Sequence, residues 1–153
     1  MRVLPHTRSC FVCGESNPIG FNLRFESDGR IVTARFVPRP EHAGFREVVH
    51  GGLIATLLDE AMVWACAVQT RQFSYCAELN VRFLSPLKPA QSAIISAELV
   101  SNRKGRIFEA KAGLKSESGV SLATSTGKYL PIKEVDAKIL AQDFVDTGTW
   151  PLG

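Results

Sequence analysis

The chain has 153 residues, of which 45% are hydrophobic and 22% charged, a composition typical of one globular domain and unlike that of a disordered or collagen-like chain. The net charge is only +3 and no basic run occurs, so charge does not favour nucleic acid as a partner. The 4 cysteines need not form disulfides, because a domain of this length buries enough surface to fold without them.

The N-terminal sequence MRVLPHTRSCFVCG lacks the continuous apolar stretch of a secretion signal. The longest apolar run, Leu53–Val68, contains Asp59 and Glu60 near its middle and is shorter than the ~20 residues that a membrane span requires. We therefore predict a cytoplasmic protein that does not associate with membranes and whose cysteines stay reduced.

Two strands are predicted early in the chain. The sequence FNLRFES alternates apolar and polar residues, so Phe21, Leu23 and Phe25 share one face. Ser27-Asp28-Gly29 is a hairpin turn signal, and the segment from Arg30 to Val37 alternates again. These segments predict a hairpin, which is followed by an irregular loop that begins at Pro38.

The segment HGGLIATLLDEAMVWACAV, from His50 to Val68, is rich in alanine and leucine and has no proline, which favours a helix. A helix that is apolar nearly all round must be covered on all sides, so we expect it to lie at the centre of the fold.

We predict one domain, residues 1–153, with a head at 1–20 and a tail at 131–153. The chain between the helix and the tail predicts a sheet. The turns between the later strands are short, which predicts sequential antiparallel pairing in a sheet of five or six strands around the helix, an α+β fold. In the tail, an amphipathic stretch from Val135 to Phe144 precedes an irregular end, Thr-Gly-Thr-Trp-Pro. The strands are expected at Ser74–Leu84, Ser92–Val100, Arg106–Lys115 and Ser121–Leu130.

The start of the helix carries the first chemical signal. Two glycines, Gly51 and Gly52, leave backbone N–H groups open at the positive end of the helix dipole, which suits an oxyanion. Gly52 and Asp59 are seven positions apart, so they look out of one helix face, ~10 Å apart along the axis. Glu60 points about 100° away, so the two acids cannot both face one substrate. A buried carboxylate needs a partner, a proton or a solvent-reachable pocket, so these acids mark either a functional site or a structural ion pair.

The strings HGGLIATLLDEAM, AELNVRFLSPLKPAQ and CFVCGESNPIGFNLRF together resemble hotdog-fold acyl-CoA thioesterases of the phenylacetate-degradation (PaaI-like) type. The resemblance implies a sheet wrapped around the helix, pairing of two chains edge to edge, often doubling to a tetramer, and an active site between subunits. It implies an acyl-CoA substrate, no cofactor, and no nucleic-acid or membrane partner.

The resemblance also implies roles for individual residues. The Gly52 amide polarises the thioester carbonyl, and Asp59 acts as general base or as nucleophile. His50 orients the leaving thiol or the loop. We predict further substrate contacts at Gly51, Glu60, Cys76 and Ala77.

The chain departs from some members of this family at two helper positions. Gly44 stands where they have an amide side chain, and Cys76 stands where they have a serine or threonine. The attacking water is then held by another group, with His42 and Glu47 as candidates, or by the partner subunit. Cys76 is equally consistent with a small core residue.

His6, Cys10 and Cys13 are spaced like half of a zinc site, but the neighbouring sequence offers no fourth ligand. We therefore predict no metal and a structural role for the head, and leave metal binding open.

Two rival functions remain. A dehydratase or hydratase of the same fold would use His42 with Glu60, although the HGG entry and the position of Asp59 fit hydrolysis better. A module that binds acyl-CoA without turnover is the other alternative, favoured by the missing helpers.

Overall fold

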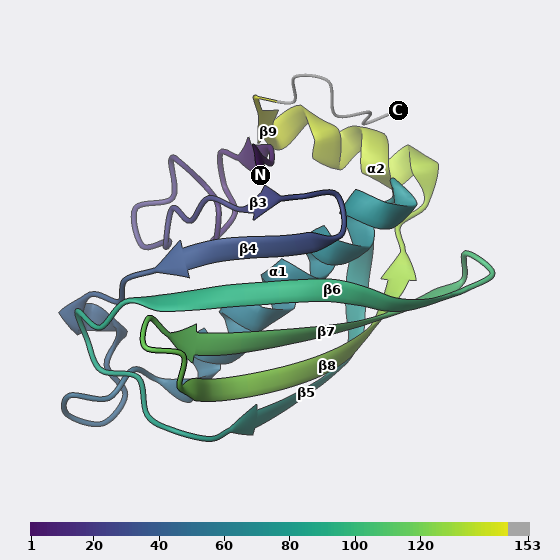
Figure 1. Ribbon diagram of the computed structural model, residues 1–153. Coiled ribbons are helices and arrows are strands. Elements are labelled where there is room, and N and C mark those ends of the chain that lie inside the picture. Colours follow the sequence, from purple (N-terminus) through teal and green to yellow (C-terminus); the bar gives the residue numbers. More distant parts are fainter. Residues whose placement is uncertain (147–153) are drawn as a thin grey trace.

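The computed structural model describes residues 1–146. Its main element is a seven-stranded antiparallel sheet that curves around one helix (Figure 1). The irregular end predicted from Thr147 lies outside the described residues. The strands, in order across the sheet, are β1 (Arg2–Val3), β3 (Glu26–Ser27), β4 (Ile31–Phe36), β6 (Ala93–Arg103), β7 (Ile107–Ser116), β8 (Ser121–Pro131) and β5 (Ser74–Phe83).

The α+β arrangement is confirmed, but the sheet has seven strands where five or six were predicted, because β1 is an additional two-residue strand at one edge. The predicted sequential pairing is wrong at one place. The strand β5 does not pair with β6, the next strand along the chain; it lies at the far edge and pairs with β8. Loop length alone therefore did not determine which strands meet.

The early hairpin forms only at its turn, where β3 pairs with β4. Leu23 and Phe25 are buried on one face, as predicted, but the chain before β3 is irregular. Asn22 has a positive φ of 51°, and the N–H groups of Phe21 and Leu23 donate to the head rather than to the sheet. The predicted strand is therefore reduced to Glu26–Ser27.

The central helix α1 spans Gly51–Thr70 and ends at Arg71, which adopts a left-handed conformation. It packs against β4, β5, β6, β7 and β8, and its buried side chains include Leu57, Leu58 and Trp64. Its 20 residues make it the one helix within residues 1–146 that is long and apolar enough to cross a membrane, and 56% of its most apolar window is buried inside the fold. Burial in the core accounts for that apolar composition.

The two ends of the described chain meet beside α1. The head strand β2 (His6–Thr7) pairs with β9 (Phe144–Val145) in a separate two-stranded sheet. The Ser9 hydroxyl donates to the Asp143 carboxylate at 2.6 Å. The head and tail therefore form one layer over the helix (Figure 1). The remaining helical segments are the 3-10 turns η1 (Pro40–His42) and η2 (Ala141–Asp143) and the helix α2 (Glu134–Leu140).

Phe144 anchors this layer, since its ring lies 6.0 Å from that of Trp64 and 5.1 Å from that of Phe73. We expect Phe144→Ala to lower the free energy of unfolding by about 1–3 kcal/mol, less than a fully buried phenylalanine would cost. Ile139→Ala, at a side chain that is 62% exposed, is the matched control and should change stability little. Chemical denaturation measures both; equal effects would show that the tail does not stabilise the core.

Candidate active site

The carboxylate of Asp59 lies on a half-buried face of α1, and its Oδ1 accepts a hydrogen bond of 2.9 Å from the hydroxyl of Tyr129 on β8. Gly52 lies on the same helix face, as the spacing predicted. No ion pair within residues 1–146 involves Asp59. A neutral donor therefore positions this carboxylate without neutralising it.

Tyr129 is itself fixed by the sheet. Its side chain is fully buried, and a Cβ at Gly127 would stand 2.7 Å from its ring, so the missing side chain leaves room for the phenol to reach α1. Burial and the negative charge of Asp59 raise the pKa of the Tyr129 hydroxyl well above its usual range. The phenol is therefore a hydrogen-bond donor throughout the neutral range.

A β-bulge in β5 lies opposite Tyr129. Cys76 pairs with Tyr129, the next pair is Glu78 with Lys128, and Ala77 is left unpaired between them. Burial and the Asp59 charge raise the pKa of the Cys76 thiol to about 11, so this thiol stays protonated at neutral pH. The structure thus brings the predicted residues Cys76 and Ala77 to the Asp59 end of the site. Bulges often re-aim side chains beside active sites.

His50 caps the start of α1, and its Nδ1 accepts the Gly52 N–H at 2.9 Å. The Gly52 amide, which was predicted to hold an oxyanion, therefore donates to a side chain of its own chain. The neighbouring Gly51 N–H makes no hydrogen bond within residues 1–146. A Cβ on Gly51 would lie 3.3 Å from the ring of Phe83, the last residue of β5, so this strand passes close to the helix start.

Glu60 does not join this group. Its Oε1 accepts a 3.7 Å hydrogen bond from the Cys10 thiol in the head, on another side of the helix. Burial, with a smaller contribution from Cys10, raises the pKa of the Glu60 carboxyl to about 8. The structure therefore separates Glu60 from Asp59, in agreement with their 100° offset, and a substrate contact by Glu60 stays a prediction.

The rival dehydratase assignment requires an accessible His42, and the structure does not provide one. His42 is buried against the rings of Phe21 and Phe36, and its Nδ1 accepts the Arg39 N–H at 3.0 Å. Burial lowers the pKa of His42. Its geometry is that of a neutral histidine packed into the loop before α1.

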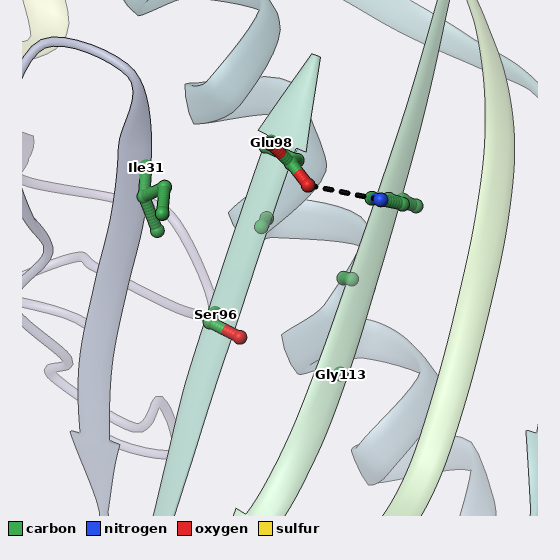
Figure 2. Close-up of a pocket in the computed structure, with 7 residues that line it drawn as sticks. Ile31, Ser96, Glu98 and Gly113 are labelled. Atoms are coloured by element: carbon green, nitrogen blue, oxygen red, sulfur yellow. Dashed lines mark ion pairs between the residues drawn. The ribbon is translucent and has the colours of Figure 1, made fainter. Parts of the chain in front are cut away.

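A separate pocket of about 260 Å³ lies on the outer face of β4, β6 and β7 (Figure 2). Ile31, Ser96 and Gly113 line it, together with an ion pair of 3.0 Å between Glu98 and Lys111. The helix lies behind the strands in this view, so the pocket is on the face of the sheet away from Asp59. Its acid is already paired with a cation, unlike Asp59.

Residues 47–123 match the family model described as Thioesterase superfamily, which covers Gly51, Gly52, Asp59, Cys76 and Ala77. The chain belongs to the thioesterase superfamily. No curated protein sequence matches it significantly. The matched region excludes Tyr129 and the cysteine-containing head, so the family model does not account for these two features.

Solved structures confirm the hotdog fold of this superfamily member. A thioesterase superfamily protein superposes with a TM-score of 0.74 at 23% identity, over 80% of this chain and 63% of its own length. The E. coli PaaI protein from the phenylacetic acid degradation operon gives 0.67 at 17% identity, over 74% and 81%. A Streptococcus mutans protein bound to acetyl CoA gives 0.68 at 14% identity, over 77% and 94%.

The stability that His50 contributes as the N-cap of α1 can be measured separately from any chemical role of its imidazole ring. Removing the acceptor in His50→Ala should lower the free energy of unfolding by about 1 kcal/mol, whereas His50→Asn keeps an acceptor for the Gly52 N–H and should stay within about 0.5 kcal/mol of wild type. Thermal and urea unfolding measure the difference. If both variants lose the same stability, the Gly52–His50 hydrogen bond does not contribute as a cap.

The Asp59–Tyr129 contact can be tested by titration, because the chain has only 2 tyrosines. In a Tyr75→Phe background the near-ultraviolet phenolate absorbance reports Tyr129 alone, and adding Asp59→Asn should shift its ionisation to lower pH by removing the negative charge. Since the folded pKa lies above the ordinary value of about 10, the stability that Tyr129 contributes is complete below that pH and is lost as the pH rises further. Circular dichroism must confirm folding at each point; an unchanged titration would contradict the contact.

Proposed function

We propose that the protein hydrolyses an acyl-CoA thioester to a free acid and CoA, with Asp59 as general base or nucleophile. The observation that carries the proposal is the Asp59 carboxylate, which is half-buried, has no cation partner within residues 1–146 and is oriented by the Tyr129 hydroxyl. A structural ion pair, the alternative explanation for an acid on an apolar helix, is not what the described residues contain. Membership of the thioesterase superfamily supports the reaction class.

Thioester hydrolysis needs a base or nucleophile and a donor for the developing oxyanion. In the base form, water attacks the carbonyl carbon and gives a proton to Asp59; the C–S bond then breaks, and the proton passes to the departing thiolate. In the nucleophile form, the Asp59 carboxylate attacks the carbonyl carbon, and the C–S bond breaks to release the CoA thiolate. Water then hydrolyses the resulting anhydride, which gives the free acid, restores Asp59 and supplies the proton that the thiolate takes up. Either path develops negative charge on the carbonyl oxygen, which needs backbone N–H groups.

The Gly52 N–H serves as oxyanion donor once the substrate oxygen takes the place of His50 Nδ1. The exchange is local, since the imidazole of His50 is solvent-exposed and its turning away frees the amide. The unpaired Gly51 N–H is the second candidate donor. His50, released from the amide, then lies beside the leaving thiol.

The spacing of the two groups favours a site shared by two chains. Seven residues of helix separate Gly52 from Asp59 by ~10 Å along the axis, whereas groups acting on one carbonyl must each approach it to about 3 Å. We therefore propose that the Gly52 amide of one chain acts with the Asp59 carboxylate of a second copy. The edge strand β5 supports this pairing, because Tyr75 and Phe83 on it are 58% and 55% exposed. A homodimer, or a homotetramer built from two dimers, is the proposed assembly.

The substrate class is tested by removing the proposed base. We expect Asp59→Asn to fold and to bind acyl-CoA but to lose at least about a hundredfold in turnover, the contribution of a positioned base. The assay is thiol release from short, medium, long and aryl acyl-CoAs. Glu117→Gln is the matched control, because Glu117 is an exposed acid paired with Arg35 on the outer surface and should leave turnover unchanged.

Three outcomes would contradict the assignment. Full hydrolysis by Asp59→Asn together with its loss in Glu60→Gln would show that the other helix acid is catalytic. Water addition to an enoyl-CoA without thiol release from a saturated acyl-CoA would indicate a hydratase. Acyl-CoA binding without any thiol release by the wild-type protein would indicate a binding module.

A further inference from the structure

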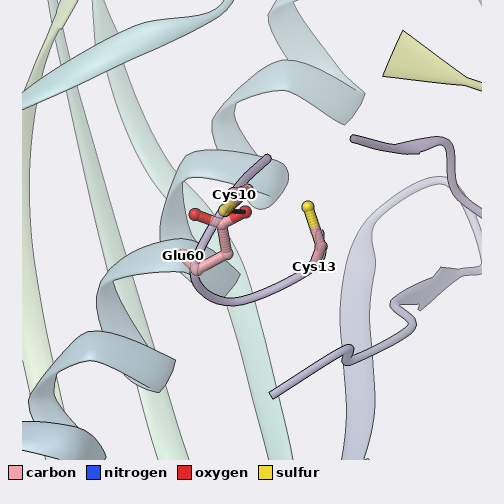
Figure 3. A group of neighbouring side chains, drawn as sticks. All are labelled: Cys10, Cys13 and Glu60. Carbon is pink, nitrogen blue, oxygen red and sulfur yellow. Dashed lines mark hydrogen bonds between the residues drawn. The ribbon is translucent and has the colours of Figure 1, made fainter. Parts of the chain in front are cut away.

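The head and the central helix bring three potential metal ligands together. The Sγ atoms of Cys10 and Cys13 and a carboxylate oxygen of Glu60 all lie within 4.8 Å of one another (Figure 3). The two cysteines come from one turn of the head and Glu60 from α1, so residues fifty positions apart meet here. These residues take no part in the proposed thioester chemistry.

The separation of the ligand atoms suits a small tetrahedral ion. Zinc bonds of ~2.3 Å to sulfur and ~2.1 Å to oxygen at a tetrahedral angle place the two ligand atoms ~3.6 Å apart. Cys10 Sγ and Glu60 Oε1 are 3.7 Å apart. This pair of atoms therefore already has the spacing that a tetrahedral zinc ion requires.

The turn that carries the sulfurs is fixed by its own hydrogen bonds. The Gly14 N–H donates to the Cys10 carbonyl at 2.9 Å, and a Cβ on Gly14 would stand 2.2 Å from that oxygen, so only glycine fits. The Val12 N–H donates to Cys10 Sγ at 3.3 Å, and the Cys10 N–H donates to the Thr7 hydroxyl. Such outer contacts orient metal ligands before the metal binds.

Ionised ligands at this site would lack compensation without a metal. No lysine, arginine or histidine within residues 1–146 forms an ion pair with Glu60, although its carboxylate is largely enclosed between the head and α1. His6, the ligand that the sequence suggested, is engaged elsewhere, because its Nε2 contacts Glu15 at 2.9 Å. An ionised Glu60 and two thiolates would require a cation at this point.

We propose that Cys10, Cys13 and Glu60 bind one Zn²⁺ ion per chain, with water as the fourth ligand. Thiolate and carboxylate ligands in a tetrahedral arrangement select zinc over the hard ions Mg²⁺ and Ca²⁺, which prefer six or more oxygen ligands. The metal fastens the head to α1 at the residue next to Asp59. Because metal binding couples to folding, it also stabilises the head on the helix.

The experiment uses the full-length protein, purified with its thiols reduced and stripped of metal with a chelator. Zn²⁺ is titrated in competition with a chromophoric chelator, and Co²⁺ is added separately as a spectroscopic probe. We expect one Zn²⁺ per chain, and for Co²⁺ the near-ultraviolet thiolate charge-transfer band and the intense visible bands of a tetrahedral site. Mg²⁺ should not compete at millimolar concentration.

The ligand set is tested with single variants. Cys10→Ser and Cys13→Ser should each weaken or abolish the charge-transfer band, and Glu60→Gln should keep the band but weaken Zn²⁺ binding at least tenfold. Cys76→Ser, at an exposed cysteine outside the cluster, is the matched control and should bind as wild type does. Should the cysteine variants fail to fold, wild type and Glu60→Gln still decide the matter.

Several outcomes would overturn the proposal. One is a reduced wild-type protein that binds less than a tenth of an equivalent of Zn²⁺ or shows no thiolate band with Co²⁺. Equal Zn²⁺ affinity in Glu60→Gln and wild type would remove Glu60 from the site, and the three-ligand proposal would fail. Binding that Cys76→Ser weakens as much as Cys10→Ser does would place the metal elsewhere.

Discussion

The hydrogen bond between Tyr129 and Asp59 is the contact on which the candidate active site depends. A carboxylate on the central helix of a small fold is costly unless it is solvated, paired or hydrogen-bonded. Here a buried phenol supplies the hydrogen bond and contributes no charge, so the acid is held in one orientation without an ion pair. An arginine or lysine at the same point would have turned the site into a structural ion pair.

The fold supplies this contact through three local features. The helix carries Asp59 on a half-buried face, Gly127 leaves space for the Tyr129 ring, and the bulge at Ala77 brings Cys76 beside both. None of these three features is sufficient for catalysis by itself. Together they place a negatively charged group next to the sheet edge at which a second chain would pair, and the Gly51–Gly52 amides lie at the other end of the same helix face.

The sequence predicted the parts of the structure that depend on local pattern. The helix from His50 to Val68, the turn at Ser27–Gly29 and the shared face of Gly52 and Asp59 follow from periodicity and turn chemistry. Tyr129 was missed because its role depends on β8 packing against α1, a contact between distant segments that no local pattern encodes. The ligand Glu60 was missed for the same reason, since it meets Cys10 only after the head folds over α1. The pairing of His50 with the Gly52 amide was also missed, because an N-cap histidine is uncommon.

The most direct test is a crystal structure of the protein with a non-hydrolysable acyl-CoA analogue, in which a methylene group separates the carbonyl from the sulfur. The account predicts the carbonyl oxygen within hydrogen-bond distance of the Gly52 N–H of one chain, His50 turned away from that amide, and the Asp59 carboxylate of the second chain beside the carbonyl carbon. An acyl group seated in the outer-face pocket at Glu98 and Lys111, or a carbonyl that reaches neither Gly52 nor Asp59, would contradict it.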